Sequence, residues 1–445
     1  MQSARVPCLL VVFIALASAA AMPAQDESRP PLVVIGERLI DSTGAPSKPG
    51  YAVVIEGNRI TQVGPKNQIR IPDGAQVIEV PGTTVLPGLV DAHTHPAFFL
   101  PHPRDFEDDS LCALRGTALL KQALDNGITL VRDLGGRNNV AIGLKLAIQK
   151  GYLEAPRLVV ANQVMASTGA HGGEFELMLP EKVMVPSDSP GEWRRNIRKN
   201  FALGADFTKV TPPFTAEEVQ VAVETTHSLG ALISVHAGGR KGGKPVASGW
   251  YADWDMMMVE WAVAAGADII EHLYPMKNEA QVIEMMKRQG TLIVPTVSTS
   301  RRGARESWDK PSEDDNRFQL SGKHFEDRFR KMHQAGIPMA IATDVEGQYQ
   351  DKIAGFYNDE LKQFMAWGYS AIEVLQAATH VGAMTAGMAD SVGTLEVGKL
   401  ADVIVVPGNP LDDITVVTRP ILVIKDGEIL RDRRKSSMSP SATTP

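Results

Sequence analysis

The segment Asp91–His95 carries two histidines, His93 and His95, separated by one residue, and it follows directly on the apolar run Val85–Val90. Side chains two residues apart on an extended strand lie on the same face, so His93 and His95 can bind one metal ion together. Neutral imidazole is a common zinc ligand. Such a pair also occurs on surfaces and in cores without any metal, so by itself it is weak support for a site.

Four more polar residues stand at or near the ends of short apolar runs later in the chain. They are Lys209 in Phe207–Val210, His236 after Leu232–Val235, His272 shortly after Ile269–Ile270, and Asp344 shortly after Met339–Ala342. Each alone is compatible with a hydrogen-bonded residue at a strand end, and Lys209 also with an ion pair to Asp206. Six such residues on five runs nevertheless favour one shared metal site, provided that the ends of the runs meet.

Eight short apolar runs alternate with helix-like stretches through the middle of the chain, and they are the elements that must bring these residues together. The runs are Val85–Val90, Ile128–Val131, Leu158–Ala161, Phe207–Val210, Leu232–Val235, Ile269–Ile270, Leu292–Val294 and Met339–Ala342. Helical periodicity is clearest in Leu111–Asn126, Ala216–Leu229, Ala280–Arg288 and His324–Ala335, and two more helices are expected at Tyr357–Trp367 and Ala371–Thr385. Eight strand–helix units predict a TIM barrel, in which the carboxyl ends of all strands surround one mouth.

Both ends of the chain instead read as short strands separated by turns. The runs are Leu32–Ile35, Tyr51–Ile55 and Ile60–Val63 at one end, and Ala401–Val406 and Ile421–Ile424 at the other. We therefore predict one small β-sandwich domain built from residues 26–84 and 393–432, with the barrel at residues 85–392. Residues 433–445 are rich in Ser, Pro and Thr and are expected to be disordered.

Residues 1–25 have the composition of a secretory signal peptide, with Arg5 before the apolar run Leu9–Ala17 and small residues after it. The run is shorter than the ~20 residues that a membrane span requires, so no span is expected after removal of the signal. We predict a periplasmic or secreted protein, with a retained N-terminal anchor as the alternative. Cys112 is then the one remaining cysteine, which excludes an intramolecular disulfide.

The composition of the 445 residues, 44% hydrophobic and 22% charged, is that of an ordinary globular protein. The formal net charge of −7 gives no basic excess of the kind that binds nucleic acid, so no nucleic-acid partner is expected.

Three segments of the chain resemble the amidohydrolase superfamily: Leu86–His95, Gly127–Asp133 and Gly393–Asp402. The resemblance extends from about Val33 to about Leu430 and is closest to the imidazolonepropionase-like and prolidase-like branch. That branch includes dipeptidases, carboxypeptidases and ochratoxin-hydrolysing amidases.

The resemblance implies a binuclear metal centre. His93, His95 and Asp344 would bind the more buried ion, His236 and His272 the more exposed ion, and Lys209 would bridge both as a carbamate. Zinc fits these ligands best, with manganese or cobalt as alternatives. A hydroxide that bridges the two ions would attack the scissile carbonyl, and Asp344 would transfer the proton to the leaving amine.

Substrate contacts are expected from three further residues. By the resemblance, His171 in a glycine-rich stretch contacts the substrate carbonyl or oxyanion, and a loop histidine without a role is the alternative. Arg240, in a loop with Lys241 and Lys244, or Arg302 next to Arg301 can attract a substrate carboxylate by charge. The chain departs from many relatives at Gly238, where they carry a second histidine.

Hydrolysis of an amide bond in a dipeptide or N-acyl amino acid is the function that we predict, with ochratoxin-type amides included. Cyclic-amide hydrolysis of the imidazolonepropionase type and ester or lactone hydrolysis are the enzymatic alternatives. A catalytically inactive metal-binding or solute-binding protein is the non-enzymatic one. Relatives often assemble, so a homo-oligomer is a further expectation.

Overall fold

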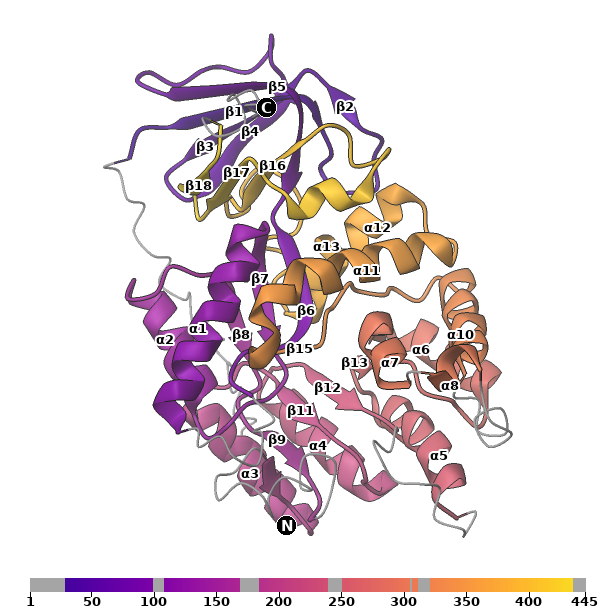
Figure 1. The fold of residues 1–445 in the computed structure, drawn as a ribbon. Coiled ribbons are helices and arrows are strands. Elements are labelled where there is room, and N and C mark those ends of the chain that lie inside the picture. Colours follow the sequence, from indigo (N-terminus) through magenta and orange to yellow (C-terminus); the bar gives the residue numbers. More distant parts are fainter. Residues whose placement is uncertain are drawn as a thin grey trace, which may run out of the picture.

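The computed structural model describes residues 29–98, 108–168, 184–238, 250–304, 306–310 and 321–434. The predicted signal peptide and nearly all of the predicted tail lie outside these ranges. The described chain forms a sheet domain from its two ends and a larger α/β domain from its middle (Figure 1). Among the described residues we find no helix with the length and apolarity that crossing a membrane requires.

The sheet domain combines strands from both chain ends in the order β18-β17-β16-β5-β1-β3-β4, with β2 paired to β1. Its strands are β1 Leu32–Leu39, β2 Lys48–Pro49, β3 Tyr51–Glu56, β4 Arg59–Pro65, β5 Gln76–Pro87, β16 Val403–Pro407, β17 Leu422–Lys425 and β18 Glu428–Asp432. The long strand β5 pairs in parallel with β1 and antiparallel with β16. Residues from both parts, such as Val34 and Val53 with Val405 and Leu422, share one buried cluster. The prediction of a sandwich made from both ends is confirmed.

Parallel strands of the middle region form the barrel. They are β6 Leu89–His95, β7 Ile128–Asp133, β8 Arg157–Val160, β9 Val164–Ala166, β10 Met184–Pro186, β11 Thr208–Val210, β12 Ile233–His236, β13 Ile269–Glu271 and β14 Leu292–Val294. Strands β6–β8 belong to one sheet and β9–β14 to another.

Backbone hydrogen bonds connect these two sheets at both junctions. On one side Asp206 N donates to Val160 O over 2.8 Å. On the other side the segment 338–344 lies between β14 and β6, because Ala340 N donates to Ile293 O over 2.9 Å and Ala92 N to Ile341 O over 3.1 Å. With β6, β7, β8, β11, β12, β13 and β14, this segment makes eight barrel strands, and β9 and β10 are additional strands beside β11. The predicted TIM barrel is confirmed.

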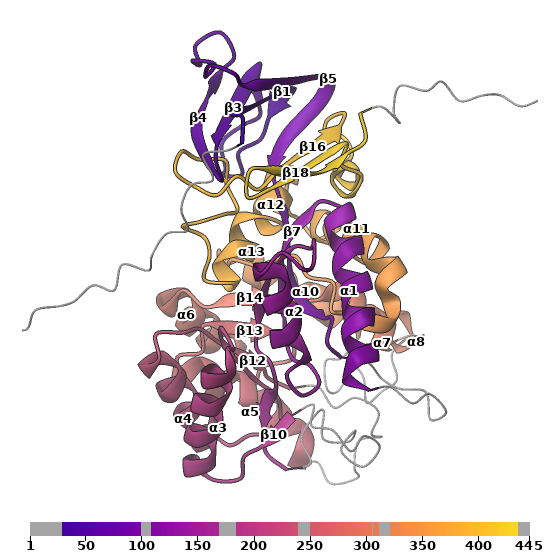
Figure 2. The same cartoon turned by 90° about the vertical axis from the view of Figure 1, so that its left-hand side faces the viewer.

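Helices cover the outside of the barrel, as Figures 1 and 2 show from two directions. They are α1 Asp109–Asp125, α2 Val140–Gln149, α3 Pro190–Leu203, α4 Ala216–Ser228, α5 Trp250–Ala265, α6 Glu279–Gln289, α7 Val297–Ala304, α8 Glu306–Asp309, α10 Gly322–Gln334, α11 Ile353–Ala366, α12 Ala371–Ala377 and α13 His380–Thr385. The short strand β15 Val345–Glu346 pairs with β6, and the 3-10 turns η2 Gly347–Lys352 and η3 Ile414–Thr418 lie before α11 and β17.

Two expected elements are divided in the structure. The run Val85–Val90 splits at Gly88, because β5 ends at Pro87 and β6 begins at Leu89. A Cβ atom at Gly88 would lie 2.1 Å from Thr129 Oγ1, so the packing there requires a glycine. The helix expected at Ala371–Thr385 splits at Thr379, whose backbone is not helical and whose hydroxyl donates to Leu375 O over 2.6 Å.

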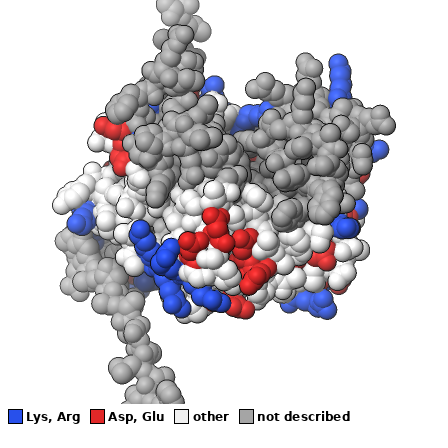
Figure 3. All heavy atoms as spheres, turned by 90° about the horizontal axis from the view of Figure 1, so that it is seen from below, with Lys and Arg blue, Asp and Glu red and all other residues white. Residues whose placement is uncertain are grey.

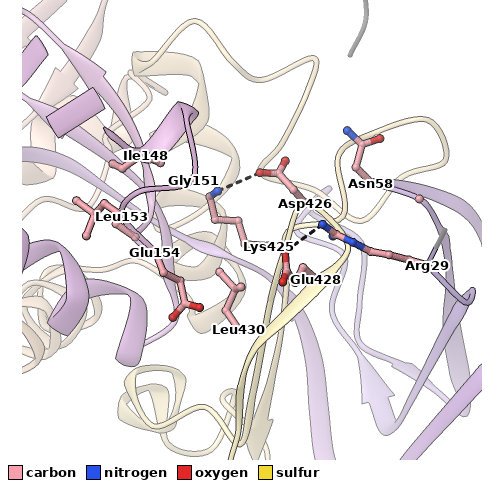
Figure 4. Close-up of a pocket in the computed structure, with 12 residues that line it drawn as sticks. Arg29, Asn58, Ile148, Gly151, Leu153, Glu154, Lys425, Asp426, Glu428 and Leu430 are labelled. Atoms are coloured by element: carbon pink, nitrogen blue, oxygen red, sulfur yellow. Dashed lines mark hydrogen bonds and ion pairs between the residues drawn. The ribbon is translucent and has the colours of Figure 1, made fainter. Parts of the chain in front are cut away.

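A cavity of about 410 Å³ lies between the two domains (Figure 4). Its walls come from the segment before β8, around Gly151 and Leu153, and from the β17–β18 hairpin with Lys425, Asp426 and Glu428. This places the cavity at the amino ends of the barrel strands. The predicted site residues stand at the carboxyl ends of the strands, so the cavity is not part of that site.

Candidate metal centre

His93, His95 and Asp344 bring three potential ligand atoms together at the end of β6. The two Nε2 atoms lie 3.2 Å apart, and Asp344 Oδ1 lies 3.3 Å from His93 Nε2 and 3.4 Å from His95 Nε2. The His93 side chain is 1% exposed, that of His95 19% and that of Asp344 13%. We call these three residues the His93 side of the centre. Two imidazoles and one carboxylate are a ligand set that suits zinc.

Hydrogen bonds orient the histidine rings. His93 Nδ1 donates to Glu271 Oε2 over 2.6 Å, and His95 Nδ1 donates to Gly135 O over 2.8 Å. With Nδ1 protonated, the lone pair on Nε2 points at the neighbouring ligand atoms. Partners of this kind fix the tautomer of metal-binding histidines in proteins.

Glu271 is a residue of the site that the sequence reasoning missed. It is fully buried and accepts hydrogen bonds from His93, from the Ser234 hydroxyl and from Arg132 Nη1, the last over 3.2 Å. Burial tends to raise the pKa of Glu271, but His93, Lys209 and Arg132 outweigh it and hold the pKa below the ordinary value. A usable signal did exist: a glutamate inside a buried strand, directly before His272, needs a specific partner.

Lys209, His236 and His272 form the other half, which we call the Lys209 side. The His236 and His272 rings lie 4.3 Å apart between centroids, and the His93 and His272 rings 5.1 Å. Tyr274 stacks on His236 with centroids 5.4 Å apart and ring planes at 10°. His272 therefore contacts both sides, and the metal ligands expected from the sequence gather around one mouth.

The Lys209 side chain is 2% exposed. Its Nζ atom has no hydrogen-bond partner among the residues that the structure describes. Burial lowers the pKa of Lys209 to about 8, against the opposing effect of the Glu271 and Asp344 carboxylates. Near neutral pH, roughly a tenth of such lysines carry the neutral amine that reacts with CO₂, a far larger share than for an exposed lysine.

Backbone strain concentrates at this mouth. His272, Thr296 and Asp344 all adopt the left-handed region, with φ of 63°, 46° and 49°. Such conformations cost about 1–3 kcal/mol each and persist where surrounding contacts fix them. Here Asp344 N donates to His93 O over 2.8 Å, His272 N donates to Val294 O over 2.7 Å, and His272 Nδ1 lies 2.5 Å from Thr296 Oγ1.

The charges of the site suit a cation. Burial tends to raise the pKa of Asp344, but His93, His95 and His272 outweigh it and keep the pKa well below the ordinary value. Burial lowers the pKa of His93 and of His272, whereas Asp344 outweighs burial at His95 and raises the pKa of that ring. A carboxylate and two imidazoles within reach of one another are a ligand set that suits a divalent cation.

The three expected substrate contacts have different outcomes. Arg302 lies exposed in the last turn of α7. Its guanidinium lies 3.5 Å from the Phe356 ring centroid and donates to Thr343 O over 3.4 Å. Arg302 thus contacts Thr343, the residue directly before Asp344. His171 and Arg240 lie outside the described residues.

Figure 3 shows the lower end of the molecule, where acidic and basic side chains gather in adjacent groups.

The chain matches the amidohydrolase family over residues 84–430. This match covers more than half of its length, and the chain belongs to that family. It is accordingly a hydrolase that acts on amide-type carbon–nitrogen bonds.

Individual relatives narrow the branch. An ochratoxinase from Aspergillus niger is 26% identical over 449 residues, covering 89% of this chain and 85% of the ochratoxinase. An imidazolonepropionase from Symbiobacterium thermophilum is 26% identical over 412 residues, covering 83% of this chain and 86% of that enzyme. A solved Xaa-Pro dipeptidase with bound methionine in the active site has a TM-score of 0.75 and 27% identity, over 90% of this chain and 100% of the dipeptidase. The predicted resemblance to the imidazolonepropionase-like and prolidase-like branch is confirmed.

Proposed function

We propose that this protein is a binuclear metal hydrolase that cleaves the amide bond of dipeptides or N-acyl amino acids with a free carboxylate. The observation that carries the proposal is the buried Lys209 amine beside two histidines, opposite a preformed group of two histidines and an aspartate. The similarity to an ochratoxinase and a Xaa-Pro dipeptidase supports the substrate class, because both names describe enzymes of amide-type substrates.

His93, His95 and Asp344 would hold one ion, and His236 and His272 the other. Lys209 would join them after its neutral Nζ attacks CO₂ and loses a proton, which yields an anionic carbamate. Divalent ions bound here supply acidification of water and polarisation of the scissile carbonyl. Zinc is the ion that this ligand set favours.

Asp344 is the proton carrier in this proposal. Its Oδ1 atom lies 3.3 and 3.4 Å from the Nε2 atoms of His93 and His95, so the carboxylate is placed to accept a proton from a water bound between them. It then donates that proton to the leaving nitrogen, which departs as an amine. Glu271 keeps the His93 ring in one orientation while the charge at the site changes.

Among the residues that the structure describes, Arg302 is the candidate for binding the substrate carboxylate. Stacking on Phe356 fixes the guanidinium plane, and the contact with Thr343 O places it beside Asp344. Arg240 is the rival, and His171 is proposed to contact the substrate carbonyl. An Arg302→Ala variant should raise KM more than Arg240→Ala does; the reverse order would transfer the role to Arg240.

The proposed function is tested by screening zinc-loaded protein against dipeptides, N-acyl amino acids and an ochratoxin-type amide, with metal counting on the same sample. We expect two ions per chain and turnover of substrates with a free carboxylate. One ion per chain would contradict the binuclear centre. Turnover of only cyclic amides, esters or lactones would contradict the proposed class of linear amide substrates. No turnover of any substrate with full metal loading would favour a binding protein.

We also propose that the protein is exported, on the composition of residues 1–25 alone. The intact mass of protein recovered from the periplasm or medium should correspond to a chain that lacks this segment. A mass that includes Met1 would contradict cleavage. The predicted homo-oligomer stays a prediction, and light scattering on the same material measures it.

A further inference from the structure

Asp91 and Thr343 form a fully buried pair behind the metal centre, and neither has a ligand role in the proposed function. Thr343 Oγ1 donates to Asp91 Oδ2 over 2.7 Å, and Thr343 N donates to Asp91 Oδ1 over 2.9 Å. Both residues are 0% exposed. The two strands that carry them are thereby joined by a side chain that binds a backbone amide and a hydroxyl at once.

The pair is connected directly to a metal ligand on each strand. Asp91 Oδ1 also accepts from His93 N over 3.4 Å, and Thr343 directly precedes Asp344. Asp344 N in turn donates to His93 O over 2.8 Å. Asp91 and Thr343 therefore close a ring of contacts that includes the backbone of both ligands.

The other polar groups around Thr343 are also engaged. Its carbonyl accepts from Thr299 Oγ1 over 2.9 Å, and its hydroxyl accepts from Val345 N over 3.2 Å. Asp344 is thus held on both sides along the chain, in the left-handed conformation with φ of 49°. An aspartate in that conformation relaxes toward more common backbone angles unless its neighbours are fixed.

We propose that Asp91 and Thr343 are positioning residues that hold the Asp344 carboxylate against His93, in the place where metal binding and proton transfer need it. This inference rests on the proposed function, because it concerns the geometry of that same centre. It assigns the pair a role in the site and not only in the stability of the barrel.

The test compares Thr343→Val with Thr343→Ser and with Thr94→Val. The valine at 343 removes the hydroxyl at nearly constant shape, whereas serine keeps it. Thr94 is the matched control: it is also 0% exposed and lies between His93 and His95, but its hydroxyl donates to Arg132 O over 2.8 Å instead of to Asp91. Each purified protein is titrated with Co²⁺ in bicarbonate buffer while the visible absorption is recorded, and its melting temperature and steady-state kinetics are measured.

For Thr343→Val we expect an altered Co²⁺ spectrum, Co²⁺ affinity and kcat each lower by about 10-fold or more, and an unchanged KM. Thr343→Ser and Thr94→Val should give the wild-type spectrum and kcat. If Thr343→Val does not fold, Thr343→Ala takes its place with Thr94→Ala as its control.

Equal losses in the variants at 343 and 94 would overturn the inference, because any buried hydroxyl would then have the same effect. A wild-type spectrum and kcat in the Thr343 variant, with only a lower melting temperature, would also overturn it. If the wild-type protein itself takes up no Co²⁺, the proposed function fails and the positioning role fails with it.

Discussion

The two sides of the proposed metal centre differ in how completely the fold builds them. On the His93 side, three ligand atoms already lie within 4.8 Å of one another, and a hydrogen bond to Nδ1 orients each of the two histidine rings. On the Lys209 side, the two histidine rings are in place, but the unmodified lysine carries no oxygen that could bind a metal.

This difference suggests an order of assembly. The His93 side can bind a cation as soon as the barrel has folded, because its ligands are an ionised aspartate and imidazoles. The Lys209 side first needs a covalent change, and burial favours that change by lowering the pKa of the amine to about 8. Under the proposed function, binding of a first ion should therefore depend on folding alone, and binding of a second ion on CO₂ as well.

The largest effect should come from Asp344→Asn, which leaves an oxygen for metal binding but removes the proton carrier. We expect kcat to fall by roughly 10²–10⁴-fold while the zinc content at saturating zinc stays near that of the wild type. Steady-state kinetics and metal analysis on one preparation measure both. Asp351→Asn, an exposed aspartate in the turn after β15, is the control. Turnover near the wild-type rate in Asp344→Asn would exclude this aspartate as the proton carrier.

Lys209→Ala addresses the other side. Without the bridging carbamate we expect loss of the second ion and a fall in kcat of roughly 10²–10³-fold, with partial recovery when short carboxylic acids supply the missing oxygens. Zinc analysis and kinetics with and without acetate or propionate check this, and wild-type protein in the same acids is the control. Two tightly bound ions in the variant would show that the Lys209 side does not depend on the lysine.

Much of the fold could be predicted because its signals are local. Short apolar runs followed by polar residues located the barrel strands, and the strand-rich ends located the sheet domain. The helices α2, α3, α5, α7 and α8 were not predicted. For α3 a signal was present, since Ser189 caps its first turn and Pro190 is its first residue, a common helix start.

The ligand types of the site were readable, but their supporting contacts were not. Histidines and an aspartate at strand ends follow from the sequence pattern and from barrel geometry. The bond between His93 and Glu271 spans 178 residues, and that between Asp91 and Thr343 spans 252. Any buried polar residue could satisfy either partner, so only the three-dimensional packing decides which pairs form.

A smaller effect is expected from Glu271→Gln. This variant tests whether the hydrogen bond that orients the His93 ring helps the His93 side to bind metal. The amide keeps the size of the side chain but provides one acceptor in place of two. We expect zinc affinity to fall by about 10–100-fold. Calorimetric zinc titration measures this. Ser234→Ala is the matched control, because it removes a neighbouring contact of Glu271 and leaves the bond to His93 intact. Equal affinity in both variants would mean that His93 needs no such partner.

The smallest effect on the centre should come from Glu360, a buried acid on α11 that contacts neither side. Its Oε1 accepts from Ser298 N over 2.5 Å. Burial raises its pKa from 4.5 to about 8, despite the opposing hydrogen bonds. Between these two values the unfolded chain releases this proton and the folded chain retains it, so the free energy of unfolding should fall as the pH rises through that window.

Glu360→Gln removes this titration and keeps an acceptor for Ser298 N. Thermal melts from pH 5 to pH 8 should therefore show a flatter dependence in the variant, with a difference of at most a few kcal/mol, while the zinc content stays unchanged. Glu373→Gln is the control, because that glutamate is only partly buried and its contacts with Ser370 and His333 lower its pKa, which predicts stability that grows with pH instead. An unaltered pH dependence in Glu360→Gln would show that this carboxyl is ionised in the folded protein. Loss of zinc in Glu360→Gln would instead show that Glu360 on α11 influences metal binding.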